Sequence, residues 1–158
     1  QTDDHLTFAF GDATGHGLKA GTIVTATKVL FNSYAILEDP VEMLNNISRS
    51  LKAMGFRNMY MAMLMAKISK EKMIISSAGM PFPFLYRESD KTVVDILLKG
   101  MPLGSFPGFA YQSANISFKP EETILFHSDG LGECFNEGGE TFGESRIKSI
   151  FKKNFCKF

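Results

Sequence analysis

The sequence has no excess of charge of either sign, because 17 Lys and Arg residues balance 17 Asp and Glu residues. A nucleic-acid or anionic-membrane surface needs a basic excess to capture phosphate groups, so this balance argues against both kinds of partner. Long apolar runs are also lacking: stretches such as 59–66 fall far short of the ~20 residues that span a bilayer. No basic segment followed by an apolar one opens the sequence, so we do not expect secretion.

Cysteine is scarce, with only Cys134 and Cys156 in 158 residues. A domain of this size with 44% hydrophobic residues can build a normal core and does not need a disulfide. We therefore expect two free thiols in a reducing cytoplasm.

The sequence contains a series of expected strands and helices that favours one domain, residues 1–158. The order is a strand, two helices, several strands and a final helix, which favours an α+β fold with antiparallel sheet over an alternating β-α-β fold. The expected strands are Leu6–Phe10, a strand from Met59, Met73–Ser77, Pro81–Tyr86, Thr92–Leu98, Ser113–Phe118 and Thr123–His127.

The expected helices follow from apolar residues at steps of three and four. Ile23, Ala26, Leu30, Tyr34 and Leu37 mark the first helix, and Asp39-Pro40 marks the start of the second with Asp39 as N-cap. Gly143–Phe155 forms the last helix, with Ile147, Ile150 and Phe151 facing inward.

Methionine alternates with other apolar residues in the strand that begins at Met59, which predicts that both faces of this strand are buried. We interpret these methionines as core residues and not as a copper site.

The sequence opens without methionine, and Asp3-Asp4 precedes the first expected strand. An Asp-Asp pair in this place is typical of a hairpin tip, which predicts that a preceding strand is missing. We expect the chain to be a piece of a longer protein.

Two aspartates share one local context, since Asp12 and Asp129 each follow an expected strand and precede glycine and a helix. Carboxylates at strand ends can reach a common point and bind hard cations such as Mg²⁺ or Mn²⁺. The alternative is that each aspartate caps the helix behind it. Both interpretations are open from the residues alone.

The segment Gly11-Asp12-Ala13-Thr14-Gly15-His16-Gly17 fits neither a Walker loop nor a dinucleotide-binding motif. Its glycines still allow a ligand to approach the backbone, and the helix start favours an anion. His16 is either a general acid or a turn histidine bonded to backbone. We expect His5 and His127 to be structural.

Four segments in order resemble motifs of the SpoIIE/RsbU group of PPM-type serine/threonine phosphatases. The first is Gly11–Gly17, which is similar to G-D-x-x-G-H/K-G. The others are Ser77–Pro83 (S/N-A-G-H-x-P-P, with Met80 in place of His), Gly100–Gly104 (G-x-P-L-G), and Ser128–Glu133 with Asn136, Gly139-Glu140, Phe142-Gly143 and Arg146 (T-D-G-[LV]-x-E-x-x-N…G-E-x-[FY]-G-x-x-R).

This resemblance implies a β-sandwich of antiparallel sheets flanked by helices in α-β-β-α layers, with terminal strands missing from this chain. It implies two Mn²⁺ or Mg²⁺ ions, with Asp12 and Asp129 as catalytic metal ligands and the Ala13 carbonyl as a further contact. Gly15, His16 and Gly17 are the candidate substrate-binding residues. The family's other acidic ligands are expected before Gln1 and after Phe158.

The function that the resemblance implies is dephosphorylation of phosphoserine or phosphothreonine on a STAS-type anti-sigma-factor antagonist, in a cytoplasmic protein with an upstream sensor domain. The alternative is a catalytically incomplete domain that binds a partner. A nucleotide-binding protein is a third class, but no motif that reads adenine or ribose is visible.

Missing strands expose backbone groups and apolar side chains at sheet edges. We therefore predict that the chain self-associates or is marginally stable. Size-exclusion chromatography and thermal melting test this: a monomer that melts cooperatively above ~65 °C contradicts it, since mesophile domains usually melt at ~45–65 °C.

Overall fold

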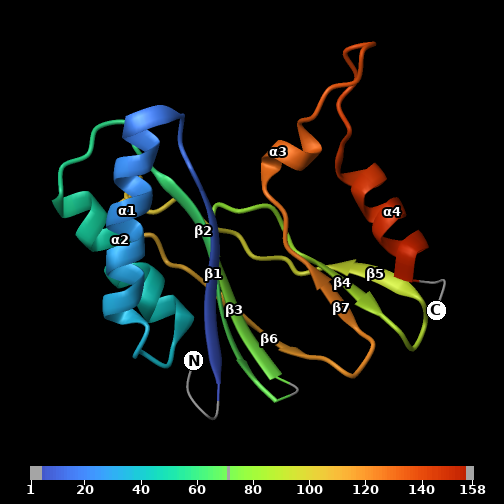
Figure 1. Cartoon of the computed structure of the whole chain (residues 1–158). Coiled ribbons are helices and arrows are strands. Elements are labelled where there is room, and N and C mark those ends of the chain that lie inside the picture. Colours follow the sequence, from blue (N-terminus) through green and yellow to red (C-terminus); the bar gives the residue numbers. More distant parts are fainter. Residues whose placement is uncertain (1–4, 71, 156–158) are drawn as a thin grey trace. The chain divides into compact units, whose positions relative to one another are not determined.

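The computed structural model describes residues 5–70 and 72–155 (Figure 1). The expected Asp3-Asp4 hairpin tip and Cys156 lie outside these residues. The chain divides into two units, each with its own sheet. The first unit is formed by the chain up to Met80 together with Leu98–Phe118, and the second by Pro81–Leu97 together with the chain from Lys119 onward.

The first unit contains a four-stranded antiparallel sheet in the order β1-β2-β3-β6, here called sheet A. Its strands are β1 (Leu6–Ala13), β2 (Met61–Ser69), β3 (Lys72–Ala78) and β6 (Ser113–Ser117). Strands β2 and β3 follow each other in the sequence and pair in antiparallel orientation. The antiparallel pairing and the mixture of sheets with helices confirm the α+β class.

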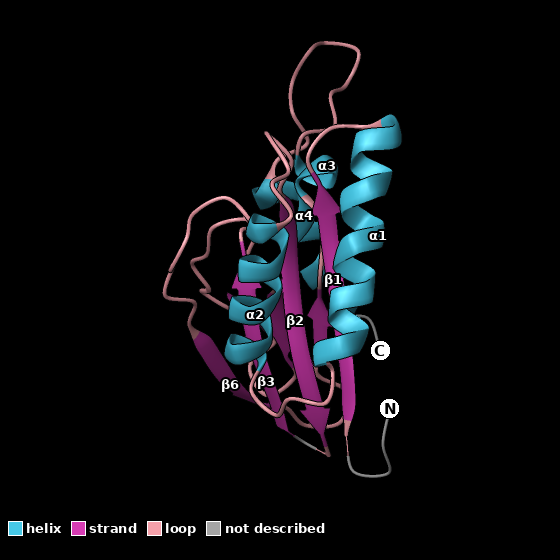
Figure 2. Cartoon of the chain, turned by 90° about the vertical axis from the view of Figure 1, so that its left-hand side faces the viewer, coloured by secondary structure: helices cyan, strands magenta, loops and turns pink. Residues whose placement is uncertain are grey.

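Helices α1 (Gly17–Tyr34) and α2 (Pro40–Ala53) cover one face of sheet A (Figure 2). The core beneath them joins Ile23 of α1 and the buried stripe of α2 to Met61, Met63 and Met65 of β2. Leu37 lies beyond the end of α1 and not on the helix as predicted, and it still packs against this core.

The prediction that both faces of the methionine strand are buried is confirmed. Met61, Met63 and Met65 point to the helix side, and Leu64 and Ala66 are buried on the other face. Flexible thioethers fill irregular space well, which suits them to a core between a helix pair and a sheet.

The start of α2 also agrees with the sequence. One carboxylate oxygen of Asp39 accepts a hydrogen bond of 2.9 Å from the backbone N–H of Val41. Pro40 follows as the first helical residue, where its missing N–H costs nothing. The Asp-Pro pair therefore sets the start of the helix.

The second unit contains a three-stranded antiparallel sheet in the order β5-β4-β7, here called sheet B. Its strands are β4 (Phe84–Arg87), β5 (Thr92–Asp95) and β7 (Thr123–Leu125), each shorter than predicted. The unit also contains α3 (Asp129–Gly132) and α4 (Glu144–Phe155).

Helix α4 packs on sheet B, and two of its residues that lie one turn apart are buried there. Ile147 and Phe151 are buried with Phe84 and Tyr86. The prediction that Ile150 also faces inward is wrong, because its side chain is 48% exposed. The apolar stripe of α4 is narrower than the sequence indicates.

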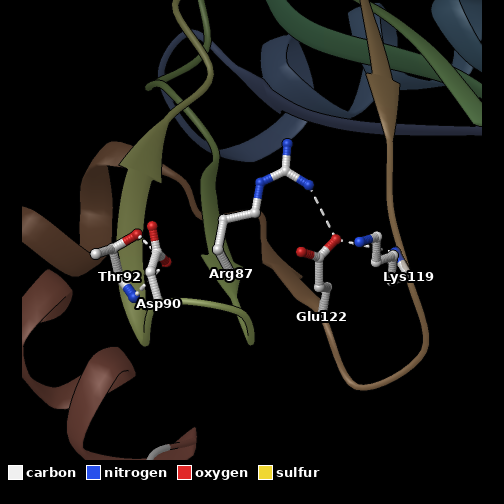
Figure 3. Close-up of polar contacts among 5 residues, drawn as sticks. All are labelled: Arg87, Asp90, Thr92, Lys119 and Glu122. Carbon is white, nitrogen blue, oxygen red and sulfur yellow. Dashed lines mark hydrogen bonds and ion pairs between the residues drawn. The ribbon is translucent and has the colours of Figure 1, made fainter.

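Polar contacts hold the turns at one end of sheet B (Figure 3). A carboxylate oxygen of Glu122 lies 2.9 Å from an Arg87 nitrogen, and the same oxygen accepts a hydrogen bond from the backbone N–H of Lys119. The Asp90 carboxylate accepts from the Thr92 hydroxyl at 2.7 Å, which lowers the pKa of Asp90. These bonds close the turn from β4 to β5 and the turn before β7.

Among the described residues, no helix combines the length and the apolar character needed to cross a membrane.

The side chain of Tyr111 is buried in the first unit and is fixed there by a hydrogen bond. Its buried hydroxyl donates a hydrogen bond of 3.0 Å to the carbonyl of Met101. Burial raises the pKa of Tyr111 above its ordinary value of 10.0, although the hydrogen bond with Ser48 opposes this shift.

We predict that Tyr111→Phe lowers the free energy of unfolding by about 1 kcal/mol at pH 7, the usual value of one hydrogen bond. Because the raised pKa means that the folded state holds the phenolic proton more tightly, wild-type stability falls as pH rises above ~10. The difference in the free energy of unfolding between wild type and Tyr111→Phe therefore becomes smaller as pH rises above ~10. Denaturant unfolding at pH 7 and pH ~10.5 checks this, and a constant difference contradicts it.

Candidate functional site

Asp12 lies inside β1 and not after it. The predicted strand ends at Phe10 because glycine usually breaks a strand, but the pairing with β2 continues through Gly11–Met63, Asp12–Ala62 and Ala13–Met61. Gly11 permits this close pairing, since a Cβ atom there would lie 2.6 Å from the carbonyl oxygen of Ala62. The glycine therefore extends the strand that carries Asp12.

Side-chain alternation places Asp12 on the face of sheet A opposite α1 and α2. Ala9 and Ala13 pack against the core under the helices, so Asp12, one residue before Ala13, points the other way. Asp12 is an exposed residue, which leaves its carboxylate accessible.

The glycine-rich turn that follows is exposed and leads directly into α1. His16 is the N-cap residue of α1, with extended backbone, and its imidazole makes no capping hydrogen bond with the described part of the helix. Gly15 and His16 precede the helix, and Gly17 is its first residue. The alternative that Asp12 caps this helix is therefore wrong.

Asp129 lies in the second unit, where β7 ends at Leu125 and not at His127 as predicted. Ser128 is the N-cap residue of α3, and Asp129 is the first helical residue. Asp129 is thus not a helix cap either. It is exposed, and the backbone N–H of Glu133 donates a 2.9 Å hydrogen bond to its carbonyl.

A cavity of about 210 Å³ beside Asp129 is lined by the carboxylate residues Asp129, Glu133 and Glu144. Of these, the sequence pattern points only to Asp129 as a candidate ligand. Glu133 could have been found because it belongs to the same motif, and Glu144 because it lies in the first turn of the last helix. Their negative charge favours cations at this surface.

His127 also lines this cavity and is buried, as its predicted structural role requires. Its ring packs against Phe84, with 5.0 Å between the ring centres. The buried Nε2 atom has no hydrogen-bond partner among the described residues.

The remaining residues of the last motif build a hairpin behind Asp129. Asn136 holds it: the backbone N–H of Glu140 donates to its side-chain oxygen at 2.9 Å, and its amide donates to the Glu140 carboxylate. Arg146 lies 3.5 Å from the same carboxylate. Since these bonds lie within the hairpin and its junction with α4, the residues act as scaffold.

The segment Gly100–Gly104 supports the end of sheet A. Leu103 forms two backbone hydrogen bonds with Met61, which pairs on its other side with Ala13. Gly100 lies so close to β3 that a Cβ atom there would overlap the carbonyl oxygen of Ser77. Two further motif segments thus brace the strand ends next to Asp12.

The candidate metal ligands are the carboxylates of Asp12 and Asp129 and the backbone carbonyl of Ala13. Mg²⁺ and Mn²⁺ prefer such oxygen ligands. Their chemistry fits the divalent ions that the family resemblance implies. Within residues 5–70 and 72–155, however, no three His, Cys, Asp or Glu side chains form a group able to hold an ion.

The sequence profile of the family described as "Stage II sporulation protein E (SpoIIE)" matches residues 2–157. The chain belongs to the SpoIIE family. Among curated proteins, phosphoserine phosphatase RsbU of Bacillus subtilis is 26% identical over 156 residues, which are 97% of this chain. The chain spans only 46% of the length of RsbU.

Solved structures support the SpoIIE-type fold. The SiaA-PP2C domain of Pseudomonas aeruginosa has a TM-score of 0.81 at 16% identity, covering 98% of this chain and 63% of that one. The RsbU and RsbW domains of a Mycobacterium tuberculosis protein have a TM-score of 0.79 at 22% identity, and the match covers 96% of this chain and 43% of that one. RsbX in complex with magnesium has a TM-score of 0.69 at 20% identity, and the match covers 99% of this chain and 77% of that one.

We predict that Gly11→Ala destabilises the chain by ~1–3 kcal/mol, because the new methyl group meets backbone atoms of β2 that cannot move aside. Gly21→Ala is the matched control. Apart from its chain neighbours and the backbone of its own helix, no described atom lies within 4 Å of a Cβ atom added at Gly21. Because alanine is favoured in the interior of α1, we expect a gain of ~0.5–1 kcal/mol.

Denaturant unfolding of both variants measures this contrast. Equal effects of the two substitutions would show that the approach of β1 to β2 at Gly11 is not a constraint.

Proposed function

We propose that this chain is the catalytic part of a metal-dependent serine/threonine protein phosphatase. Membership of the SpoIIE family and similarity to phosphoserine phosphatase RsbU support the proposal. The structural observation that carries it is that Asp12 and Asp129 are both exposed near strand ends and that neither caps a helix.

In this proposal Asp12, with the Ala13 carbonyl, and Asp129 hold divalent ions, two in the complete domain. Such ions lower the pKa of a bound water and neutralise charge on the phosphoryl oxygens. The ladder between β1 and β2 holds the backbone of Asp12 in place. At the other candidate ligand, the backbone N–H of Gly143, after the Asn136 hairpin, donates to the carbonyl of Gly132 at the end of α3, the helix that begins at Asp129.

The turn at Gly15, His16 and Gly17 is the proposed contact for the substrate phosphate. It leads into an 18-residue helix whose first turn contains no acidic residue, so the unpaired N–H groups of α1 favour an anion there. Because the His16 side chain is exposed and does not cap the helix, it is available to a substrate.

The proposed substrate is a phosphorylated STAS-type regulatory protein in sigma-factor control, with a sensor domain upstream in the parent protein. Similarity to RsbU supports this assignment. The alternative is a catalytically incomplete domain that binds a partner without hydrolysis. Met80, which stands where the family motif has His, favours that alternative.

We predict that Asp12→Asn and Asp129→Asn each reduce Mn²⁺-dependent hydrolysis of a phosphoserine protein by at least ~100-fold, since each removes charge from a metal ligand. The assay compares this chain with a longer piece of the parent protein that includes the flanking sequence, with and without Mn²⁺. Asp90→Asn removes an exposed aspartate from the turn before β5 and is the control with unchanged turnover.

Turnover by the longer protein that survives Asp12→Asn would overturn the role of Asp12. If neither protein turns over the substrate but the chain binds a phosphorylated partner, the alternative function replaces the phosphatase.

A further inference from the structure

A second cavity, of about 520 Å³, lies at the end of sheet A where β2 turns into β3. Two rows of directly opposed residues contribute to its lining, and opposed residues of an antiparallel sheet point to the same face. These residues are Lys67, Ile74 and Asn115 in one row and Ser69, Lys72 and Ser117 in the other.

This face is the one that α1 and α2 cover further along the strands. Met65, two residues before Lys67, belongs to the core under the helices. The helices do not extend over the last rows of the sheet, where Glu38 of the connection between α1 and α2 lines the cavity instead. The cavity is therefore on the same face of sheet A as the core under the helices.

Lys67 is the unusual residue of this cavity, because it is only 5% exposed and its Nζ atom is buried. That ammonium group has no hydrogen-bond partner among residues 5–70 and 72–155. Its ion-pair partner, an oxygen of Glu38, lies 3.6 Å away on a side chain that is 80% exposed. Apart from this ion pair, the buried N–H donors of Lys67 make no hydrogen bond with the described residues, which is unfavourable for a buried ammonium group.

The surroundings of Lys67 suit an anion. Lys72 adds a second ammonium group, Ser69 and Asn115 add polar side chains, and Glu38 is the only carboxylate among the described residues that line the cavity. The volume lies within the ~300–1,000 Å³ typical of small-molecule sites. We propose that this cavity binds a small organic anion whose carboxylate or phosphate group is held by Lys67 and Lys72.

The proposal is tested by calorimetric titration with two probes, inorganic phosphate and succinate, against sodium chloride of equal ionic strength. Divalent ions are first removed from protein and buffer on a chelating resin, and the chain carries Asp12→Asn, so that no divalent ion at the candidate metal site binds phosphate. We expect saturable binding of at least one probe. Binding of phosphate alone identifies a phosphate ligand, and binding of succinate alone identifies a carboxylate ligand.

Three substitutions locate the binding. Lys67→Met weakens it at least tenfold, Lys72→Met weakens it less because Lys72 is exposed, and Glu38→Gln strengthens it by removing the competing carboxylate. Lys99→Met removes an equal charge from an exposed residue outside the cavity and leaves binding unchanged. Lys67→Met keeps or raises the melting temperature, since Met replaces a buried ammonium that makes no hydrogen bond with the described residues. This separates loss of binding from loss of folding.

Three results would overturn the proposal. These are no saturable binding of either probe, equal affinity in wild type and Lys67→Met, or a lower melting temperature in Glu38→Gln without tighter binding. The last result would show that Glu38 alone satisfies Lys67.

Discussion

Gly11 lets β1 approach β2 more closely than any other residue type could, because a side chain there would meet the Ala62 carbonyl and Met61. The ladder continues past Gly11 to Ala13, and this places the exposed residue Asp12 on the face of sheet A opposite α1 and α2. Met61 then links Ala13 to Leu103, so a loop from a distant part of the chain is tied to the same place. The position of the candidate metal ligand thus depends on one close backbone contact.

Much of the fold could be predicted where a local signal was sufficient. Asp39 and Pro40 specify the start of α2 by their own chemistry, and the alternating methionines specify a strand buried on both faces. The predictions were wrong where a contact with residues distant in the sequence determines the local structure. Gly11 is a breaker by propensity but a strand residue here, since β2 leaves no room for a Cβ. Ile150 fits a helical stripe, yet the residues of α4 that are buried on sheet B are Ile147 and Phe151, while Ile150 is 48% exposed.

The candidate site was only partly predictable for the same reason. The position of Asp12 and Asp129 near glycine was visible in the sequence, whereas their exclusion as helix caps required the backbone, which gives those positions to His16 and Ser128. Glu144, which follows the hairpin before α4, lines the same cavity as Asp129. The motifs combine chemistry with scaffold: Asn136, Glu140 and Gly100 contribute to the site by holding backbone in place.

The methionine row of β2 has a chemical consequence. Met61, Met63 and Met65 are at most 6% exposed, whereas Met54 at the end of α2 and Met101 in a loop are exposed. Peroxide converts accessible thioethers to polar sulfoxides, and a sulfoxide has no place in an apolar core. Oxidation of the buried row therefore requires the helix layer to open, so its rate, compared with that of Met54, reports how often α1 and α2 separate from sheet A.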